Sequence, residues 1–114
     1  MKATQLIGGV SPKLTTQTAS FTIGIDDAGS YIRASHATVP ITVTVPLNAT
    51  VAFAVGTTIE IEQAGVVAVT VAGDVGVTVN VVTTKTLVSA ARYGVAKLIK
   101  VGTNEWTITG DLAA

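Results

Sequence analysis

Hydrophobic and polar residues alternate with a period of two along most of this chain. Successive side chains of a β-strand point to opposite faces, so the pattern predicts strands with one buried and one solvated face. Valine and threonine dominate the alternating runs, with 18 and 19 copies in 114 residues, and β-branched side chains suit a pleated surface. The clearest runs are residues 41–45, 58–62, 67–71 and 77–81.

Turn residues recur every eight to twelve positions between these runs, as in a β-sandwich or a small barrel. The chain therefore predicts an all-β fold: a single small antiparallel β-sandwich, jelly roll or barrel-like domain of about eight to nine short strands. The strand order stays open at this point. The expected strands are 21–25, 30–34, 39–45, 51–55, 57–63, 66–71, 75–82, 95–101 and 104–109, with 86–90 as a further short candidate and 95–109 as a hairpin.

The first part of the chain follows no sustained period. Residues 1–17 predict an extended N-terminal arm, and residues 18–114 predict the β domain. The arm is either a frayed terminus or a segment that becomes ordered against a partner. If it binds a partner, its apolar side chains are the expected contacts, namely Leu6, Ile7, Val10 and Leu14.

Charge is scarce in this chain. Only 12% of residues are charged and the formal net charge is zero, which provides no field to attract nucleic acid or an anionic membrane surface. Hydrophobic residues make up 48% of the chain, and no run is long enough to cross a bilayer. A small β domain with so few charges has weak protection against edge pairing, so we expect a homo-oligomer. We expect Trp106, Ile108 and Phe53 in the core or at a subunit interface.

The residue types that carry most catalysis are nearly missing. The chain has no cysteine and a single histidine, His36, so a zinc site would lack donors. Glu60 and Glu62 lie two apart on one expected strand face, where pairing with lysines such as Lys97 or Lys100 explains them better than acid–base work. No nucleophile elbow or phosphate-binding loop is present. We therefore predict no enzymatic activity, no cofactor and no metal.

Two sequence motifs of this chain resemble those of a known group of proteins. The first is V-G-T-x-I-x-I-x-Q-x-G over residues 55–65, and the second is L-I-K-V-G-T-x-x-W over residues 98–106. With the runs around them, they resemble a recurrent β module of tailed-bacteriophage structural proteins over about residues 18–112. In that family these motifs determine the fold and carry no active site.

The resemblance implies a role in a virus particle. Such modules form the terminal domains of tail-fibre or spike chains, and they also occur alone as capsid decoration (cement) proteins. The sequence starts with a methionine and a short apolar arm and has no preceding fibrous region, which favours a decoration protein. The implied protein is made in the host cytoplasm and stabilises the shell as a homotrimer on the outer surface, bound to the phage major capsid protein. A glycan-binding module of a fibre or spike, and a tail or neck component, remain alternatives.

Overall fold

The computed structural model describes residues 11–114 and is dominated by strands, which confirms the prediction of a mostly-β fold. Nine strands and one short 3-10 turn, η1, lie in this part of the chain. Their bounds are β2 Leu14–Gln17, β3 Phe21–Thr22, η1 Ile25–Asp27, β4 Tyr31–Ala34, β5 Ile41–Val45, β6 Thr58–Gln63, β7 Val69–Gly73, β8 Thr78–Asn80, β9 Val95–Gly102 and β10 Glu105–Gly110.

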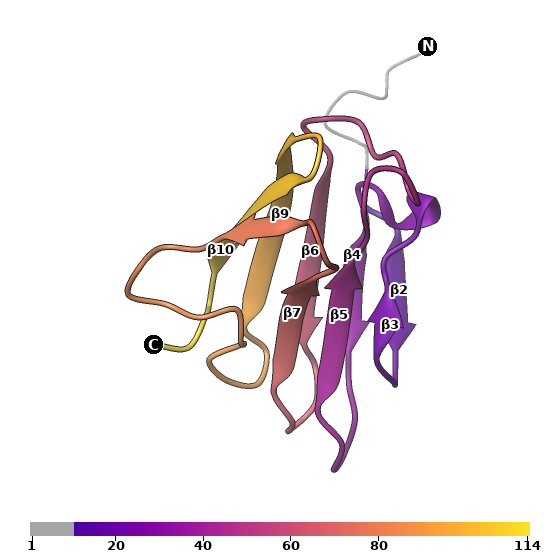
Figure 1. Ribbon diagram of the computed structural model, residues 1–114. Coiled ribbons are helices and arrows are strands. Elements are labelled where there is room, and N and C mark those ends of the chain that lie inside the picture. Colours follow the sequence, from indigo (N-terminus) through magenta and orange to yellow (C-terminus); the bar gives the residue numbers. More distant parts are fainter. Residues whose placement is uncertain (1–10) are drawn as a thin grey trace.

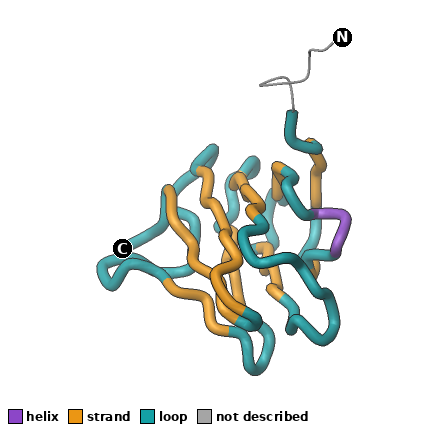
Figure 2. Tube along the Cα trace, turned by 90° about the horizontal axis from the view of Figure 1, so that it is seen from above, coloured by secondary structure: helices purple, strands orange, loops and turns teal. Residues whose placement is uncertain are grey.

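The strands form two layers, and the chain crosses from one layer to the other after almost every strand (Figures 1 and 2). One sheet has six strands in the order β2-β4-β6-β9-β10-β8, and the other has three in the order β3-β5-β7. From β2 to β7 the chain alternates between the sheets, so each pair of consecutive strands is one turn of a coil. Three such coils stack side by side.

This winding makes most strand pairs parallel, so the predicted all-antiparallel arrangement is wrong. The pairs β2/β4, β4/β6, β3/β5, β5/β7 and β8/β10 are parallel, and only β6/β9 and β9/β10 are antiparallel. The reason is that each short connection leads to the opposite sheet. The chain then returns to the first sheet from the same end, and its next strand there runs in the same direction. The β9/β10 hairpin is as expected.

Three further boundaries differ from the sequence-based expectation. Residues 14–17 belong to the domain as β2 rather than to the arm, because they pair with β4. Residues 51–55 form a loop instead of a strand. The segment near residues 86–90 makes only isolated bridges, in which Leu87 and Ser89 bond to the outer edge of β7. That segment and the C-terminal residues therefore cover the far edge of the three-stranded sheet.

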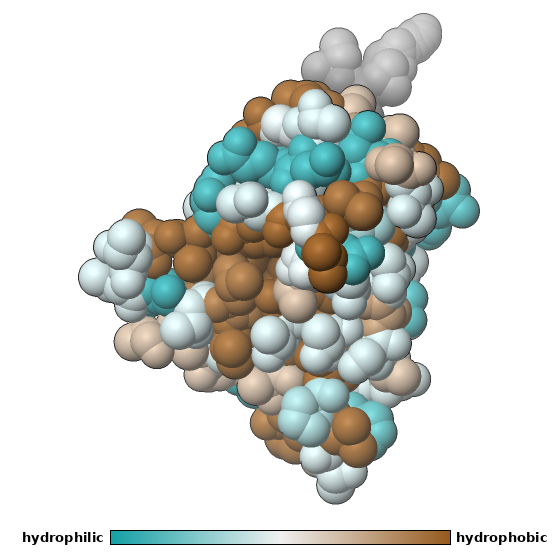
Figure 3. Space-filling model, in the orientation of Figure 1, coloured by the Kyte–Doolittle hydropathy of each residue, from teal (hydrophilic) through white to brown (hydrophobic). Residues whose placement is uncertain are grey.

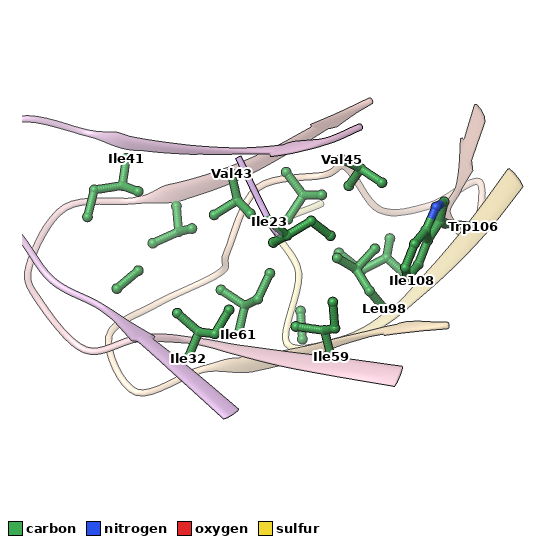
Figure 4. Close-up of a cluster of buried hydrophobic side chains, with 14 of the residues drawn as sticks. Ile23, Ile32, Ile41, Val43, Val45, Ile59, Ile61, Leu98, Trp106 and Ile108 are labelled. Carbon is green, nitrogen blue, oxygen red and sulfur yellow. The ribbon is translucent and has the colours of Figure 1, made fainter. Parts of the chain in front are cut away.

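The core lies between the two sheets, and inward side chains from both layers meet in it (Figure 4). Ile32 and Ile61 come from the six-stranded sheet, while Ile41 and Val43 face them from the three-stranded sheet. At one end of the core Trp106 packs edge-to-face on Phe53, with ring centroids 5.4 Å apart. These side chains occupy the inward positions of alternating strands, as the period of two requires.

Stacked coils bring their turns into close contact, and glycine makes this possible at one point. A Cβ on Gly65 would lie 2.9 Å from the backbone nitrogen and oxygen of His36. That separation is too short for any other residue without a shift of the backbone. Gly65, the last residue of the motif over residues 55–65, therefore allows the second and third coils to stack closely.

Candidate functional site

One end of the molecule presents two strand edges together. β2 ends the six-stranded sheet and β3 ends the three-stranded sheet, and they lie on the same side (Figure 1). Within residues 11–114 no other strand pairs with the outer edge of either one. Leu14 on β2 is 65% exposed and Ile25 of η1 is 57% exposed. We call this surface the open end: β2, β3 and η1 with these two side chains.

The residues expected to make partner contacts divide into three groups. Leu14 lies on the open end, while Leu6, Ile7 and Val10 lie outside the described residues. Trp106, Ile108 and Phe53 are at most 4% exposed and lie inside the core of a single chain. The expectation that these three form a subunit interface is corrected, because β10 turns Trp106 and Ile108 inward and the 51–55 loop places Phe53 on top of Trp106.

A second apolar feature lies at the opposite end of the six-stranded sheet. The loop after β8 stands away from β10 and leaves a pocket of about 320 Å³. Apolar surface borders it in the space-filling view (Figure 3). Half of its lining residues are aliphatic and Lys85 is its charged member: Val81, Val82, Lys85, Thr107, Ile108, Thr109, Gly110 and Leu112. Such a lining suits an apolar side chain better than a reacting group.

The outer face of the six-stranded sheet carries a polar cluster centred on Glu62. The Glu62 Oε1 atom accepts hydrogen bonds from the Tyr31 hydroxyl at 2.9 Å and from Arg33 Nε at 3.0 Å. Register explains this, because Arg33 and Glu62 are paired residues of β4 and β6. Glu62 therefore binds an arginine and not one of the expected lysines. Glu60 does have Lys97 as its cross-strand partner.

The protonation of this cluster follows from its contacts. Burial opposes ionisation of Glu62, but the hydrogen bonds from Arg33 and Tyr31 outweigh it and lower the pKa of Glu62. Burial, together with the hydrogen bond to Glu62, raises the pKa of Tyr31. The hydrogen bonds to Glu62 likewise raise the pKa of Arg33. At neutral pH the cluster thus holds one carboxylate, one guanidinium and one neutral phenol.

The lowered pKa of Glu62 predicts an acid-sensitive contribution to stability. The contribution is complete above the unfolded-state pKa, near 4.5, and is lost as the pH falls through the lower folded-state value. We expect the urea midpoint of the wild type to exceed that of Glu62→Gln at pH 7, with the gap closing as the pH falls below 4.5. Tyr31→Phe, which removes one of the two donors, should show a weaker pH dependence than the wild type. A gap that stays constant with pH would contradict the assignment.

Next to this cluster, Tyr93 has an unusual backbone. Its φ angle is +69°, and no other residue but glycine has positive φ in the described chain. This conformation costs a bulky L-residue about 1–2 kcal/mol. It is held by a 2.6 Å hydrogen bond from the Tyr93 nitrogen to the Gln63 oxygen, and Ser89 Oγ donates to the buried Gln63 side chain at 2.5 Å. The Tyr93 side chain is nonetheless 58% exposed.

Arg92 completes this part of the surface. Its Nε donates to the Ala64 oxygen at 3.2 Å, and its Cζ lies 4.9 Å from the centre of the Tyr93 ring. Sequence analysis missed all of Tyr31, Arg33, Arg92 and Tyr93. The available signal was their scarcity, because they are the only two tyrosines and the only two arginines in the chain.

The remaining candidates for chemistry are structural. His36 Nδ1 accepts hydrogen bonds from the backbone nitrogens of Thr38 and Val39 and so shapes its own loop. Over residues 11–114, no three His, Asp or Glu side chains are grouped to hold a metal ion. In the same range, no helix has the length and apolar character to span a membrane.

Comparisons with known proteins add no family. No family model, curated protein or solved structure matches this chain. The functional conclusions below therefore rest on the sequence and on the surfaces described above.

Proposed function

We propose that this protein is a non-enzymatic structural component of a bacteriophage virion, a decoration protein that binds the outer head surface and stabilises the shell. The observation that carries the proposal is the open end, where two sheet edges and the exposed Leu14 and Ile25 lie together. Edges of this kind pair readily with another chain unless something covers them. The apolar residues Leu6, Ile7 and Val10 precede this end in sequence.

Two features support a ring of copies. The six-stranded sheet ends in β2 on one side and β8 on the other, with exposed Leu14 at the first end and the aliphatic pocket near the second. A contact between two different surfaces of the same chain is head-to-tail, and such contacts close into rings when the rotation allows. We propose a homotrimer, the size that the family resemblance implies.

Attachment to the shell would follow from the N-terminal segment. We propose that Leu6, Ile7 and Val10 contact the major capsid protein, where each Å² of buried apolar surface contributes about 25 cal/mol before the costs of association. Three copies linked in one ring add avidity, so weak single contacts give firm binding. Shell stabilisation then needs no chemistry, only simultaneous contact with neighbouring capsid subunits.

Deleting residues 2–10 should separate attachment from folding. This deletion stops before the Lys13 carbonyl, which accepts a hydrogen bond from the Tyr31 nitrogen, and before β2. We expect the truncated protein to keep its β-sheet circular dichroism and its oligomer mass, a multiple of the 11.5 kDa chain. Its occupancy on phage heads should fall by about two orders of magnitude, since three contacts are lost together. Binding is measured by co-sedimentation with heads that lack the protein.

The triple substitution of Leu6, Ile7 and Val10 by serine provides the same test without shortening the chain. Val75→Ser is the matched control, because Val75 is an exposed valine elsewhere on the surface. Full occupancy by the truncated protein would overturn the attachment proposal. Antibody labelling of whole virions in the electron microscope tests the location: label on the head supports a decoration protein, and label confined to the tail, or none, overturns it.

A further inference from the structure

We infer that the Arg92–Tyr93 corner is a binding site for an acidic saccharide, one that carries a carboxylate. The site consists of Tyr93, Arg92, and the neighbouring Arg33, Glu62 and Tyr31. The inference does not depend on where the protein sits in a particle, and it can fail or hold separately from the decoration role.

The first argument is convergence. The two arginines and two tyrosines of the chain come from segments far apart in sequence, residues 31–33 and 92–93, and bond to three consecutive residues at the end of β6. Tyr31 and Arg33 bond to the Glu62 carboxylate, whereas Tyr93 and Arg92 bond to the backbone oxygens of Gln63 and Ala64. Tyr93 lies at the end of β6 in space, because its backbone nitrogen donates a hydrogen bond to the Gln63 oxygen. Tyrosine and arginine are enriched where surfaces bind other molecules.

The second argument is the backbone of Tyr93. Residues held in sparsely populated φ/ψ regions persist where surrounding structure enforces them, and they cluster at ligand sites. Glycine would adopt φ = +69° without strain. The chain instead places an aromatic ring there and leaves it exposed. Nothing in the core needs this ring, whereas a ligand that stacks on it would.

The third argument is charge, which selects the ligand class. Arg33 is paired with Glu62, the only ion pair within residues 11–114. The guanidinium of Arg92 binds a backbone carbonyl through Nε, and it has no carboxylate partner in that range. The positive charge of Arg92 favours the binding of an anionic ligand. A guanidinium binds a carboxylate through two parallel N–H donors. The guanidinium lies over one face of the Tyr93 ring, so a sugar ring that stacks on the other face of the tyrosine would bring its carboxylate close to Arg92.

The test is saturation-transfer and chemical-shift NMR on the intact protein. The probes are trigalacturonate and 3′-sialyllactose, with lactose as the neutral comparison and a triglutamate peptide as a carboxylate without a sugar. We expect at least one acidic saccharide to bind at least ten times more tightly than lactose and triglutamate, with the Tyr93 resonances shifted. Equal binding of lactose, equal binding of triglutamate, or no saccharide binding overturns the inference.

Variants locate the site. Tyr93→Gly removes the ring and the backbone strain together, so we expect binding to fall at least tenfold while the urea midpoint stays the same or rises. Arg92→Gln should also weaken acidic saccharides at least tenfold. Lys85→Gln is its matched control, because it removes one positive charge outside the proposed site, in the loop after β8, and its binding should equal that of the wild type. Loss of binding in Lys85→Gln, or retained binding in Tyr93→Gly, places the ligand elsewhere and overturns the site.

Discussion

Replacing Lys100 with alanine should lower the free energy of unfolding by about 3–5 kcal/mol. Lys100 is 2% exposed although it carries a charge. Its Nζ donates to Asn48 Oδ1 at 2.6 Å and to the Phe53 oxygen at 2.8 Å. Alanine leaves the buried Phe53 oxygen and the partly buried Asn48 oxygen without this donor and opens a cavity where the methylene chain lay. The measurement is urea unfolding followed by fluorescence.

Lys100→Met separates the two parts of this effect. Methionine keeps most of the side-chain volume but donates no hydrogen bond, and it removes a charge whose burial is itself costly. We expect a loss of about 1–2 kcal/mol, clearly smaller than that of the alanine variant. Equal losses in both variants would show that packing contributes little. A loss below about 1 kcal/mol in Lys100→Ala would contradict the role of Lys100 in holding the 48–53 loop to β9.

Replacing Trp106 with alanine should cost about 3–5 kcal/mol as well. Trp106 is 1% exposed, lies between the sheets and makes an edge-to-face contact with Phe53 at an interplanar angle of 86°. Truncation removes the largest side chain of the core and leaves Phe53 without its partner. Because domains of this size are stable by about 5–15 kcal/mol, the variant should be close to unfolding at 37 °C. Trp106→Phe should lose less.

The intrinsic fluorescence of Trp106 tests whether this residue lies in the core of a single chain. It is the only tryptophan in the protein, so intrinsic emission reports on this site alone. We expect blue-shifted emission that stays unchanged when the protein is diluted through the concentration at which the proposed oligomer dissociates. A red shift on dilution, without loss of β-sheet circular dichroism, would instead place Trp106 at a subunit interface.

Much of the strand content could be predicted from the alternation of residues, and the strand pairing could not. Alternation decides which side chains face inward, and the inward set of β5 and β6 follows it directly. It does not decide whether a short connection leads to the neighbouring strand or to the opposite sheet. Segments 25–29 and 35–40 both carry the chain from one sheet to the other, whereas an antiparallel arrangement would need them to reverse the chain within one sheet.

Lys100 shows a second limit of sequence reasoning. Its place in β9, two residues after Leu98, puts it on the inward face. We expected it outside, paired with a glutamate, because lysine is almost never fully buried without a partner. The partners are an amide side chain and a backbone carbonyl from the 48–53 loop. Residues 51–55 were predicted as a strand, so the Phe53 carbonyl could not be anticipated as a partner of Lys100.

One of the two candidate sites could be predicted in part from the sequence, and the other could not. Leu14 could be singled out from its apolar character alone, and it lies exposed on the open end. The Arg92–Tyr93 corner could not be found, since the left-handed backbone of Tyr93 and its hydrogen bond to Gln63 depend on how β6 and the 90–94 loop meet. Local patterns carry no information on such contacts between distant segments.

The C-terminal tail closes the side of the molecule away from β2 and β3 (Figure 1). The Ala113 nitrogen and oxygen are both bonded, to Val88 and Thr86, whereas Ala114 is exposed. A foreign peptide or fluorescent cargo fused after Ala114 would therefore start on the side away from β2 and β3, two residues after Leu112, which lines the pocket proposed for the contact between copies. If copies cover a shell as proposed, dense multivalent display from this terminus needs a linker long enough to clear that pocket.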